Sequence, residues 1–239
     1  SYRHHLHAHP ELSFQEFETA KYIANVLTSY HIPFKSGVAG TGLLGLIEGK
    51  NPSQKIIALR GDIDALPIME ANEVSYKSQN EGVMHACGHD VHTSCMLGSA
   101  KILNELKNEF SGTIKLIFQP GEEKAPGGAS LMIKEGVLEN PKPDSIIALH
   151  VFPTLEAGKV GFRPGKYMAS TDEVYLTVKG KGGHAAMRGT YTSPLLIASE
   201  ILIELEKVFS VVVKTEEGAD PTVLAFGKFI GQGLSLIHI

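Results

Sequence analysis

The stretch Met84-His85-Ala86-Cys87-Gly88-His89-Asp90-Val91-His92 places a thiol, three imidazoles and a carboxylate within nine residues. Cys and His side chains bind borderline-soft divalent metals, and the Cys-x-His spacing puts two such ligands on one turn. Apolar residues, Cys95 among them, then recur at helical spacing up to Leu106, which predicts a helix that begins at this stretch. The stretch indicates either a metal site at a helix N-terminus or a polar helix cap with Asp90 as the capping residue.

Apolar runs bounded by turn residues predict short strands elsewhere in the chain, of which the first two are expected to be buried. They lie at 43–47, 56–59, 113–118 and 145–149. Helical patterns alternate with these runs, at about 14–30, after 91 and at 128–135. Ser13 followed by Glu16 is typical of a capping box at the first of these helices. The alternation predicts an α/β fold with a mostly parallel sheet that is covered on both faces by helices.

The carboxyl ends of the predicted strands carry acidic and imidazole side chains. Asp62 and Asp64 follow the second strand, Glu122 and Glu123 follow the third, and His150 follows the fourth. In sheets of this class, ligands bind beyond the carboxyl ends of the strands. The sequence therefore predicts that these side chains converge on one site.

The candidate metal ligands are Cys87, His89, Glu123 and His150. Their sulfur, nitrogen and oxygen donors suit zinc or manganese better than calcium or magnesium. Glu122, beside one of them, is a candidate general base for a metal-activated water, which implies hydrolysis. Each residue also has a structural interpretation, because Glu-Glu pairs are commonly solvated and a His at a strand end can belong to the core.

Other functions are compatible with the same residues. Cys87 could be a thiol nucleophile with His89 as its base, although Cys-x-His places the two too close for a usual dyad. A four-coordinate structural zinc site or a catalytically inactive binding module is a further alternative. Four His in the segment Arg3–Pro10 could also bind a metal, but a short amphipathic turn before Pro10 is the commoner arrangement.

Composition indicates a globular protein with small-molecule partners. The 239 residues are 43% hydrophobic and carry a formal charge of -4, without a run of Lys or Arg that would indicate nucleic acid or an anionic membrane. No stretch reaches about 18 uninterrupted apolar residues and no basic-then-apolar segment opens the chain, so we expect a cytoplasmic protein. Two cysteines are too few for a disulfide framework, and we interpret Cys87 as a ligand and Cys95 as a core residue.

The sequence pattern changes from about Met168. Strands are predicted at 173–179, 211–214 and 222–229, and a helix at 195–208. The first strand alternates strictly between apolar and polar residues, which is typical of a half-solvated strand. We therefore expect a small α+β domain at 167–239 after a metal-binding domain at 1–166.

Six segments in order along the chain form a distinctive set. They are Leu6-His7-Ala8-His9-Pro10-Glu11-Leu12, Arg60-Gly61-Asp62-Ile63-Asp64-Ala65-Leu66-Pro67, His85-Ala86-Cys87-Gly88-His89-Asp90, Gln119-Pro120-Gly121-Glu122-Glu123, Leu149-His150-Val151 and Gly182-Gly183-His184-Ala185-Ala186. With them the chain resembles the di-metal amidohydrolases that cleave N-acylated amino acids. This group of the aminoacylase/carboxypeptidase metallopeptidases includes hippurate hydrolases, bacterial aminoacylases and plant indoleacetyl-amino-acid hydrolases.

The resemblance implies a zinc-peptidase-like catalytic domain with an inserted ferredoxin-like lid domain. It implies two divalent ions per subunit, zinc or manganese, whose ligands are Cys87, His89, Glu123 and His150. Glu122 would be the general base that then protonates the leaving amine. His184 would reach a partner subunit's site to polarise the acyl oxygen, so a homodimer through the lid is expected, although Gly182-Gly183-His184 is also compatible with a hairpin turn. The substrate would be an N-acyl amino acid with an acetyl, benzoyl or similar group; a dipeptidase or carboxypeptidase of the same family is the alternative.

The sequence departs from this family in some respects. The family's fifth metal ligand is a His in a later return segment of the catalytic domain, and no segment of this chain matches it. Because the chain opens at Ser1 without Met and stops at Ile239, we expect a fragment that is incomplete at the C-terminus. Without the fifth ligand and the strands around it, we expect this fragment to bind metal weakly and to be inactive. His238 is not that ligand. In the lid, Met187-Arg188-Gly189 stands where relatives usually have Pro and His, and Ser193 where they commonly have Asp.

Overall fold

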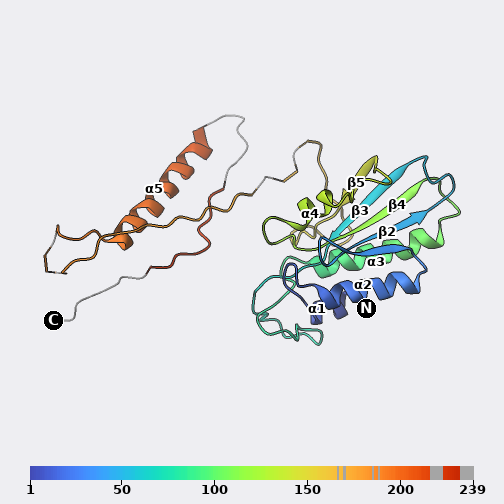
Figure 1. Ribbon diagram of the computed structural model, residues 1–239, viewed down its shortest axis with the longest axis horizontal. Helices are drawn as coiled ribbons and strands as arrows, with labels where there is room; N and C mark the ends of the chain where they lie inside the picture. Colours follow the sequence, from blue (N-terminus) through green and yellow to red (C-terminus); the bar gives the residue numbers. More distant parts are fainter. Residues whose placement is uncertain (166, 169–170, 185, 188, 216–222, 232–239) are drawn as a thin grey trace. The chain divides into compact units, whose positions relative to one another are not determined.

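Apolar runs separated by Gly, Pro and Asn residues fold into a five-stranded sheet (Figure 1). The strands are β1 (Phe34–Val38), β2 (Gly42–Glu48), β3 (Ile56–Asp62), β4 (Thr113–Gln119) and β5 (Ser145–Ala148). The helices that accompany them are α1 (Tyr2–Ala8), α2 (Phe17–Ser29), α3 (His89–Glu105) and α4 (Gly128–Lys134). Each predicted strand and helix of this part of the chain is therefore present.

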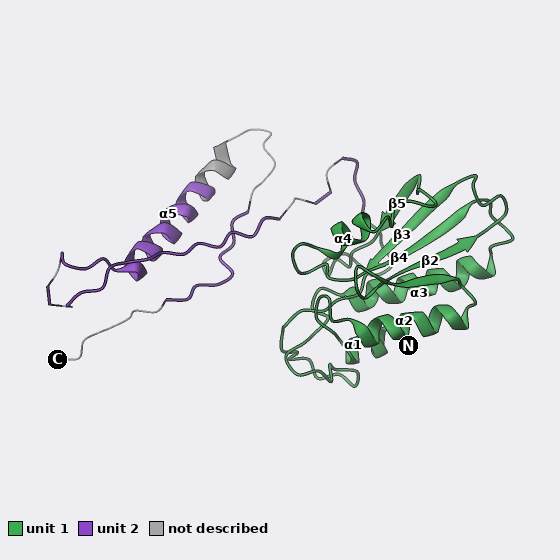
Figure 2. Ribbon diagram, viewed as in Figure 1, with its two compact units in different colours: residues 1–161 green, residues 162–239 purple. Residues whose placement is uncertain are grey.

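The computed structural model describes residues 1–165, 167–168, 171–184, 186–187, 189–215 and 223–231. The chain divides into two compact units, Ser1–Gly161 and Phe162–Ile239, which Figure 2 distinguishes by colour. The sheet and the candidate metal ligands belong to the first unit. The assignment of the two units as a catalytic domain and a lid remains a prediction.

The sheet has the strand order β1-β2-β4-β3-β5. β3 pairs in parallel with β4 and β5, whereas β2 runs antiparallel to β1 and β4. Four strands therefore share one direction, as expected for a mixed α/β fold with a mostly parallel sheet. β2 is reversed because only residues 39–41 join it to β1, and a parallel pair would need a much longer crossover. Ala39 and Gly40 close this tight connection with φ angles of 53° and 95°.

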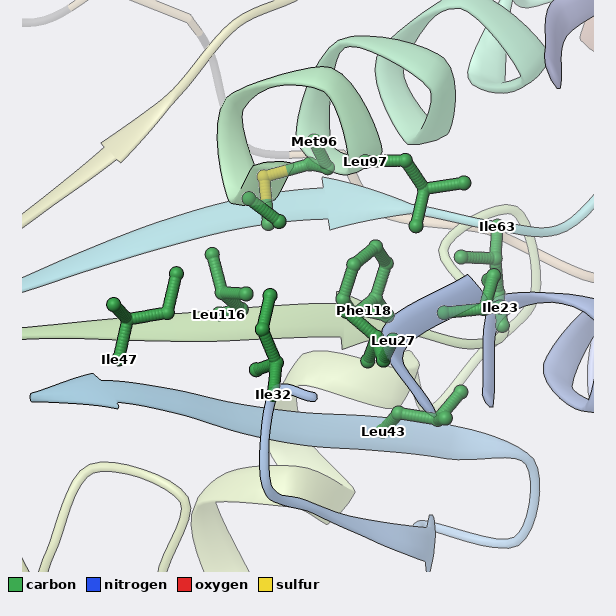
Figure 3. Packing of buried hydrophobic residues seen from close by; sticks show 11 residues of the cluster. Ile23, Leu27, Ile32, Leu43, Ile47, Ile63, Met96, Leu97, Leu116 and Phe118 are labelled. Atoms are coloured by element: carbon green, nitrogen blue, oxygen red, sulfur yellow. The ribbon is translucent and has the colours of Figure 1, made fainter. Parts of the chain in front are cut away.

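The side chains of β4 alternate between the two faces of the sheet. Leu116 and Phe118 lie in the larger core, together with side chains of α2 and α3 (Figure 3). Ile117 points to the other face, where it packs with Met132 of α4 and with Val137. Helices thus cover both faces of the sheet, as the alternation of strand and helix patterns predicted.

Lys115 lies on the same face of β4 as Ile117, yet it carries a charge. It is fully buried, and its Nζ donates hydrogen bonds to the carbonyl oxygens of Val137, Glu139 and Pro141, at 2.9, 2.7 and 2.6 Å. We expect Lys115→Met to lower the free energy of unfolding by about 3–5 kcal/mol, because three carbonyls lose a charged donor. Urea unfolding measures this loss. Lys101→Met on the exposed side of α3 is the control, and equal losses in both variants would contradict the role of Lys115.

The buried side of α3 differs from the predicted one. Cys95 is exposed rather than part of the core, and Ile102 and Leu106 are 57% and 48% exposed. Thr93 and Met96 are buried instead. The helix is rotated relative to the expected orientation because the His and Asp side chains of its first turn are buried against the ends of the strands.

The capping box predicted at Ser13 and Glu16 does not form. Glu16 is fully buried and accepts hydrogen bonds from Thr41 Oγ1 at 2.6 Å and from the Gly121 N–H at 2.8 Å. Ser13 Oγ donates to Asp64 Oδ2 at 2.6 Å. These two side chains therefore join the start of α2 to the loops after β1, β3 and β4, close to the candidate site.

The second unit contains one described helix, α5 (Pro194–Thr215). It confirms the helix predicted at 195–208, but it continues through 211–214, where a strand was predicted. No Gly or Pro interrupts the sequence there, and each residue added to an existing helix gains a backbone hydrogen bond. Among the described residues, no helix is long and apolar enough to cross a membrane.

The other strands predicted in the second unit are absent from its described residues. Residues 173–179 and 223–229 have no strand structure, and Thr222 lies outside the described residues. Val174 and Leu176, on the predicted apolar side, are 86% and 64% exposed. The ferredoxin-like arrangement is therefore not observed in the described part of this unit, and the lid domain stays a prediction.

Candidate metal centre

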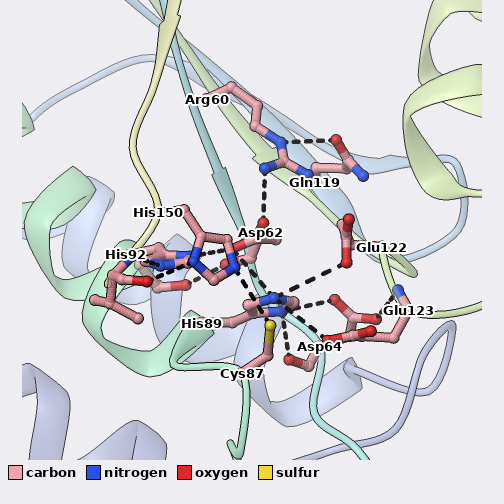
Figure 4. A network of polar contacts seen from close by, with 12 residues as sticks. Arg60, Asp62, Asp64, Cys87, His89, His92, Gln119, Glu122, Glu123 and His150 are labelled. Atoms are coloured by element: carbon pink, nitrogen blue, oxygen red, sulfur yellow. Dashed lines mark hydrogen bonds and ion pairs between the residues drawn. The ribbon is translucent and has the colours of Figure 1, made fainter. Parts of the chain in front are cut away.

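Several strand ends and the start of α3 meet at one site (Figure 4). Asp62 is the last residue of β3, the Glu122-Glu123 pair follows β4, and His150 follows β5. The closely spaced groups of potential metal-binding side chains found among the described residues are Cys87 with His89 and His150, His89 with Glu122 and Glu123, and Asp62 with His89 and His92. Within the first unit, the structure thus brings together all the residues that the sequence proposed for this site.

Gly88 allows Cys87 and His89 to belong to one tight turn. Its φ of 87° lies in the left-handed region, which L-residues rarely adopt. A β-carbon at this position would also lie 2.5 Å from Val151 Cγ2. Glycine is therefore required here both by the backbone conformation and by the close approach of the segment after β5.

The His89 ring is fixed in orientation by Asp64. Nδ1 lies 2.9 Å from the Asp64 carbonyl oxygen and 3.2 Å from Asp64 Oδ1, both of which can only accept, so Nδ1 carries a hydrogen. Nε2 is buried and has no hydrogen-bond partner in the structure as described. Its nearest carboxylate oxygens are Glu123 Oε1 at 3.7 Å and Asp62 Oδ1 at 3.8 Å. The imidazole therefore directs a nitrogen into a gap between carboxylates.

Glu123 faces the same gap. Its backbone N–H donates to Asp64 Oδ2 at 3.0 Å, and its Oε1 is buried without a hydrogen-bond partner among the described residues. Leaving two buried polar atoms unpaired costs several kcal/mol, on the order of 1–3 kcal/mol for each. Although burial lowers the pKa of His89, its hydrogen bond to Asp64 and the charges of Asp62 and Glu123 raise it overall. The gap therefore favours a positive charge, and its donors fit a divalent metal.

Cys87 and His150 complete the donor set. Cys87 Sγ lies 3.3 Å from His150 Nε2, so the imidazole next to the thiol is His150 rather than the His89 considered from the sequence. Burial, followed by hydrogen bonding to Glu123 and by the charges of Glu123, Glu122 and Asp62, raises the pKa of the Cys87 thiol to about 12. A metal-free thiol nucleophile needs a lowered pKa, so this environment disfavours that role; a bound cation would itself deprotonate a coordinating thiol, so Cys87 stays a candidate ligand.

Glu122 lies at the open side of the group. Its side chain is 40% exposed, and Oε2 lies 4.0 Å from His89 Nε2. Burial and the charges of Glu123 and Asp62 raise its pKa. A partly exposed carboxyl group with a raised pKa, adjacent to the donor set, has the position that a general base requires.

The His-rich N-terminal segment contributes to a different cluster. His7 Nδ1 lies 2.8 Å from Asp90 Oδ2 and His7 Nε2 lies 3.0 Å from Glu70 Oε1, all three side chains being buried. Arg3 Nε donates to the same Asp90 oxygen at 2.9 Å. Residues 1–10 are all described, and none of their His side chains belongs to a close metal-binding group. His7 instead joins α1 to Asp90, the residue after His89.

The contribution of this cluster to the stability of the fold depends on pH through Glu70. Although burial raises its pKa, hydrogen bonds from His7, the Ser78 N–H and Asn72 lower it to about 2, well below that of an unfolded chain. The ionised carboxylate therefore stabilises the fold above about pH 4, and this contribution is lost as the pH falls toward about 2. We expect Glu70→Gln to lower the free energy of unfolding by about 1–3 kcal/mol at pH 7, and by less at pH 3.

Urea unfolding of wild type and Glu70→Gln at pH 7 and pH 3 measures this difference. Glu73→Gln is the control, because the Glu73 side chain is 93% exposed and pairs with Lys77 only at the surface. A destabilisation by Glu70→Gln that is the same at both pH values would contradict the assignment.

His184 belongs to the second unit. Its Nδ1 accepts a hydrogen bond from the Ala186 N–H at 3.2 Å. The role expected of it, polarising the acyl oxygen in a partner's site, stays a prediction.

Known proteins share this sequence and fold. Residues 58–233 match the model of the peptidase family M20/M25/M40. The chain belongs to this family. The chain is 39% identical over 230 residues to an N-acyl-L-amino acid amidohydrolase of Geobacillus stearothermophilus, covering 96% of this chain and 60% of that protein. It is 41% identical to the IAA-amino acid hydrolase ILR1-like 5 of Arabidopsis thaliana, covering 91% of this chain and 51% of that protein.

A solved M20 structure shows the same fold. The Bacillus subtilis YXEP protein, described as a dinuclear metal binding peptidase, is 42% identical, with a TM-score of 0.65 over 69% of this chain and 45% of that one. The chain thus spans about half of the length of the M20 relatives it matches.

Sequence reasoning missed some residues that hydrogen-bond the aspartates of this candidate site. Ser13 and Arg60 bind Asp64 and Asp62, at 2.6 Å in each case, and His92 binds Asp62 at 2.6 Å. His92 is close enough in sequence to His89 to have been considered. Ser13 carried only the local pattern of a capping box, and nothing indicated Asp64, because this partner is distant in sequence.

Proposed function

We propose that the protein hydrolyses the amide bond of N-acyl amino acids, releasing a carboxylic acid and a free amino acid. The observation that carries the proposal is the pair of unpartnered buried atoms, His89 Nε2 and Glu123 Oε1, 3.7 Å apart with Glu122 beside them. The names of the relatives, an N-acyl-L-amino acid amidohydrolase and an IAA-amino acid hydrolase, support the same reaction class.

Two divalent ions, zinc or manganese, would be held by the thiol, imidazole and carboxylate donors. These donors are Cys87, His89, Glu123 and His150. Their chemistry fits such ions, and the dinuclear M20 relative supports a pair of them. When bound, the ions supply a Lewis acid that polarises the amide carbonyl and lowers the pKa of a water molecule.

Glu122 accepts a proton from the water whose oxygen attacks the amide carbon. The same carboxyl group then donates the proton to the amide nitrogen as the carbon–nitrogen bond breaks, so the amino acid leaves as an amine. Its exposed side lets a substrate reach it, and its raised pKa lets it hold the proton between the two steps. His184 of a partner subunit would polarise the acyl oxygen, which makes a homodimer through residues 167–239 part of this proposal.

Hydrolysis assays with defined metal content test the proposal. The full-length protein should release amino acids from N-acetyl, N-benzoyl and N-indoleacetyl substrates, lose this activity with a chelator and regain it with Mn²⁺ or Zn²⁺. Elemental analysis should give two ions for each subunit; one tightly held zinc would instead indicate a structural site. Undiminished hydrolysis in protein shown to be free of metal would refute the mechanism.

Two alternatives remain testable in the same assay. Faster cleavage of aminoacyl than of acyl substrates would indicate a dipeptidase or carboxypeptidase. A thiol nucleophile is the second candidate, because Cys87 Sγ lies 3.3 Å from His150 Nε2, although the raised pKa of the thiol counts against it. Inactivation by iodoacetamide with insensitivity to chelation would indicate that chemistry.

A further inference from the structure

His92 is buried beside the donor set, and both of its ring nitrogens are engaged. The Val151 N–H donates to His92 Nε2 at 2.9 Å, so Nε2 has no hydrogen of its own. Nδ1 must then carry the ring hydrogen, which it donates to Asp62 Oδ1 at 2.6 Å. Because neither nitrogen has a free lone pair, His92 does not offer a ligand atom, although it lies in one of the closely spaced groups.

Asp62, which accepts the hydrogen bond of His92, is itself fixed by hydrogen bonds to other residues. Arg60 donates to Asp62 Oδ2 at 2.6 Å and, through Nε, to Gln119 Oε1 at 2.8 Å (Figure 4). Thr93 Oγ1 donates to the Asp62 carbonyl oxygen at 2.8 Å. Although burial raises it, the hydrogen bond from His92 and the charge of Arg60 lower the pKa of Asp62 to about 2. The hydrogen bonds therefore run from the end of β4 to the Val151 backbone.

At the other end of this hydrogen-bonded chain, Val151 directly follows the candidate ligand His150. β5 ends at Ala148, so His150 and Val151 lie beyond the ladder that pairs β5 with β3. The rings of His92 and His150 are 4.6 Å apart at 67°. His92 thus fixes the backbone just after His150, where strand pairing no longer does so.

We propose that His92 is a positioning residue, which holds His150 beside Cys87 by accepting the Val151 N–H. The inference rests on the proposed function, because it takes Cys87 and His150 as ligands. Replacing a residue that orients a metal ligand without binding the metal itself typically lowers metal affinity by about 10–100-fold.

Two variants with opposite hydrogen-bonding capacity test this role. His92→Leu fills the space without an acceptor, whereas His92→Gln can place Oε1 where Nε2 accepts the Val151 N–H. The metal-free protein is titrated with Co²⁺. The thiolate-to-cobalt absorption of Cys87 and the number of Co²⁺ ions bound per subunit are measured at each step and give the affinity. We expect His92→Leu to weaken Co²⁺ binding by about 10–100-fold and His92→Gln to stay within about 3-fold of wild type. Thermal unfolding shows whether each variant is folded.

A second measurement needs neither metal nor substrate. In the metal-free wild-type protein, ¹⁵N NMR of the imidazole should show a His92 ring with hydrogen on Nδ1 and none on Nε2. A hydrogen on Nε2, or wild-type Co²⁺ affinity in folded His92→Leu, would overturn the inference. A different outcome separates the two proposals. If His92→Leu weakens Co²⁺ binding but the wild-type protein cleaves no N-acyl amino acid, the proposed function is overturned and the role of His92 still stands.

Discussion

Glu122→Gln is expected to lower kcat for N-acyl amino acids by about 10³-fold, because an amide cannot accept the proton of the attacking water. Metal content should stay the same, since Glu122 lies at the open side of the site and the unpartnered carboxylate oxygen is that of Glu123. KM should change little if Glu122 acts only in the chemical step. Steady-state kinetics with elemental analysis of the same sample measures all three quantities.

Two further variants separate the loss of a general base from the loss of a metal ligand and from the loss of any glutamate charge. Glu123→Gln should lose metal as well as activity, because it removes the carboxylate charge that lies nearest to His89 Nε2, at 3.7 Å. Glu109→Gln changes an exposed glutamate in the turn after α3 and should leave both unchanged. Near-normal kcat in metal-loaded Glu122→Gln would reject Glu122 as the base.

The convergence of the site could be predicted because it depends on topology alone. Asp62, Glu123 and His150 follow strands that run in the same direction, and parallel strands bring their carboxyl ends to one edge of the sheet. Apolar runs reveal such strands without any knowledge of their neighbours. The same logic predicted β2 as a strand but not its reversed direction, which is set by the short connection at residues 39–41.

The side chains that fix the ligands were less predictable. Ser13 and Glu16 have the spacing of a capping box, but both make tertiary hydrogen bonds, to Asp64, Thr41 and Gly121. A local pattern cannot reveal such partners, because the competing bonds come from residues distant in sequence. The face of α3 was misjudged for a related reason, since burial of its polar first turn outweighs the apolar residues Ile102 and Leu106.

His89→Ala is expected to weaken metal binding by more than about 100-fold and to abolish measurable hydrolysis. His89 belongs to all three closely spaced groups of potential ligands, and its Nε2 lies within 4.0 Å of oxygens of Asp62, Glu122 and Glu123. Without this nitrogen the carboxylates face one another across the gap with no donor between them. Isothermal titration with Mn²⁺ or Zn²⁺ and an N-acyl amino acid assay measure the two effects.

His89→Asn separates the loss of the ligand from a loss of stability. Its amide nitrogen can take the place of Nδ1 and donate to Asp64, while nothing occupies the position of Nε2. We therefore expect His89→Asn to unfold closer to wild type than His89→Ala does, yet to bind metal as weakly. Wild-type metal affinity in His89→Asn would show that the buried nitrogen is not a ligand, because only Nε2 distinguishes the two side chains at the gap.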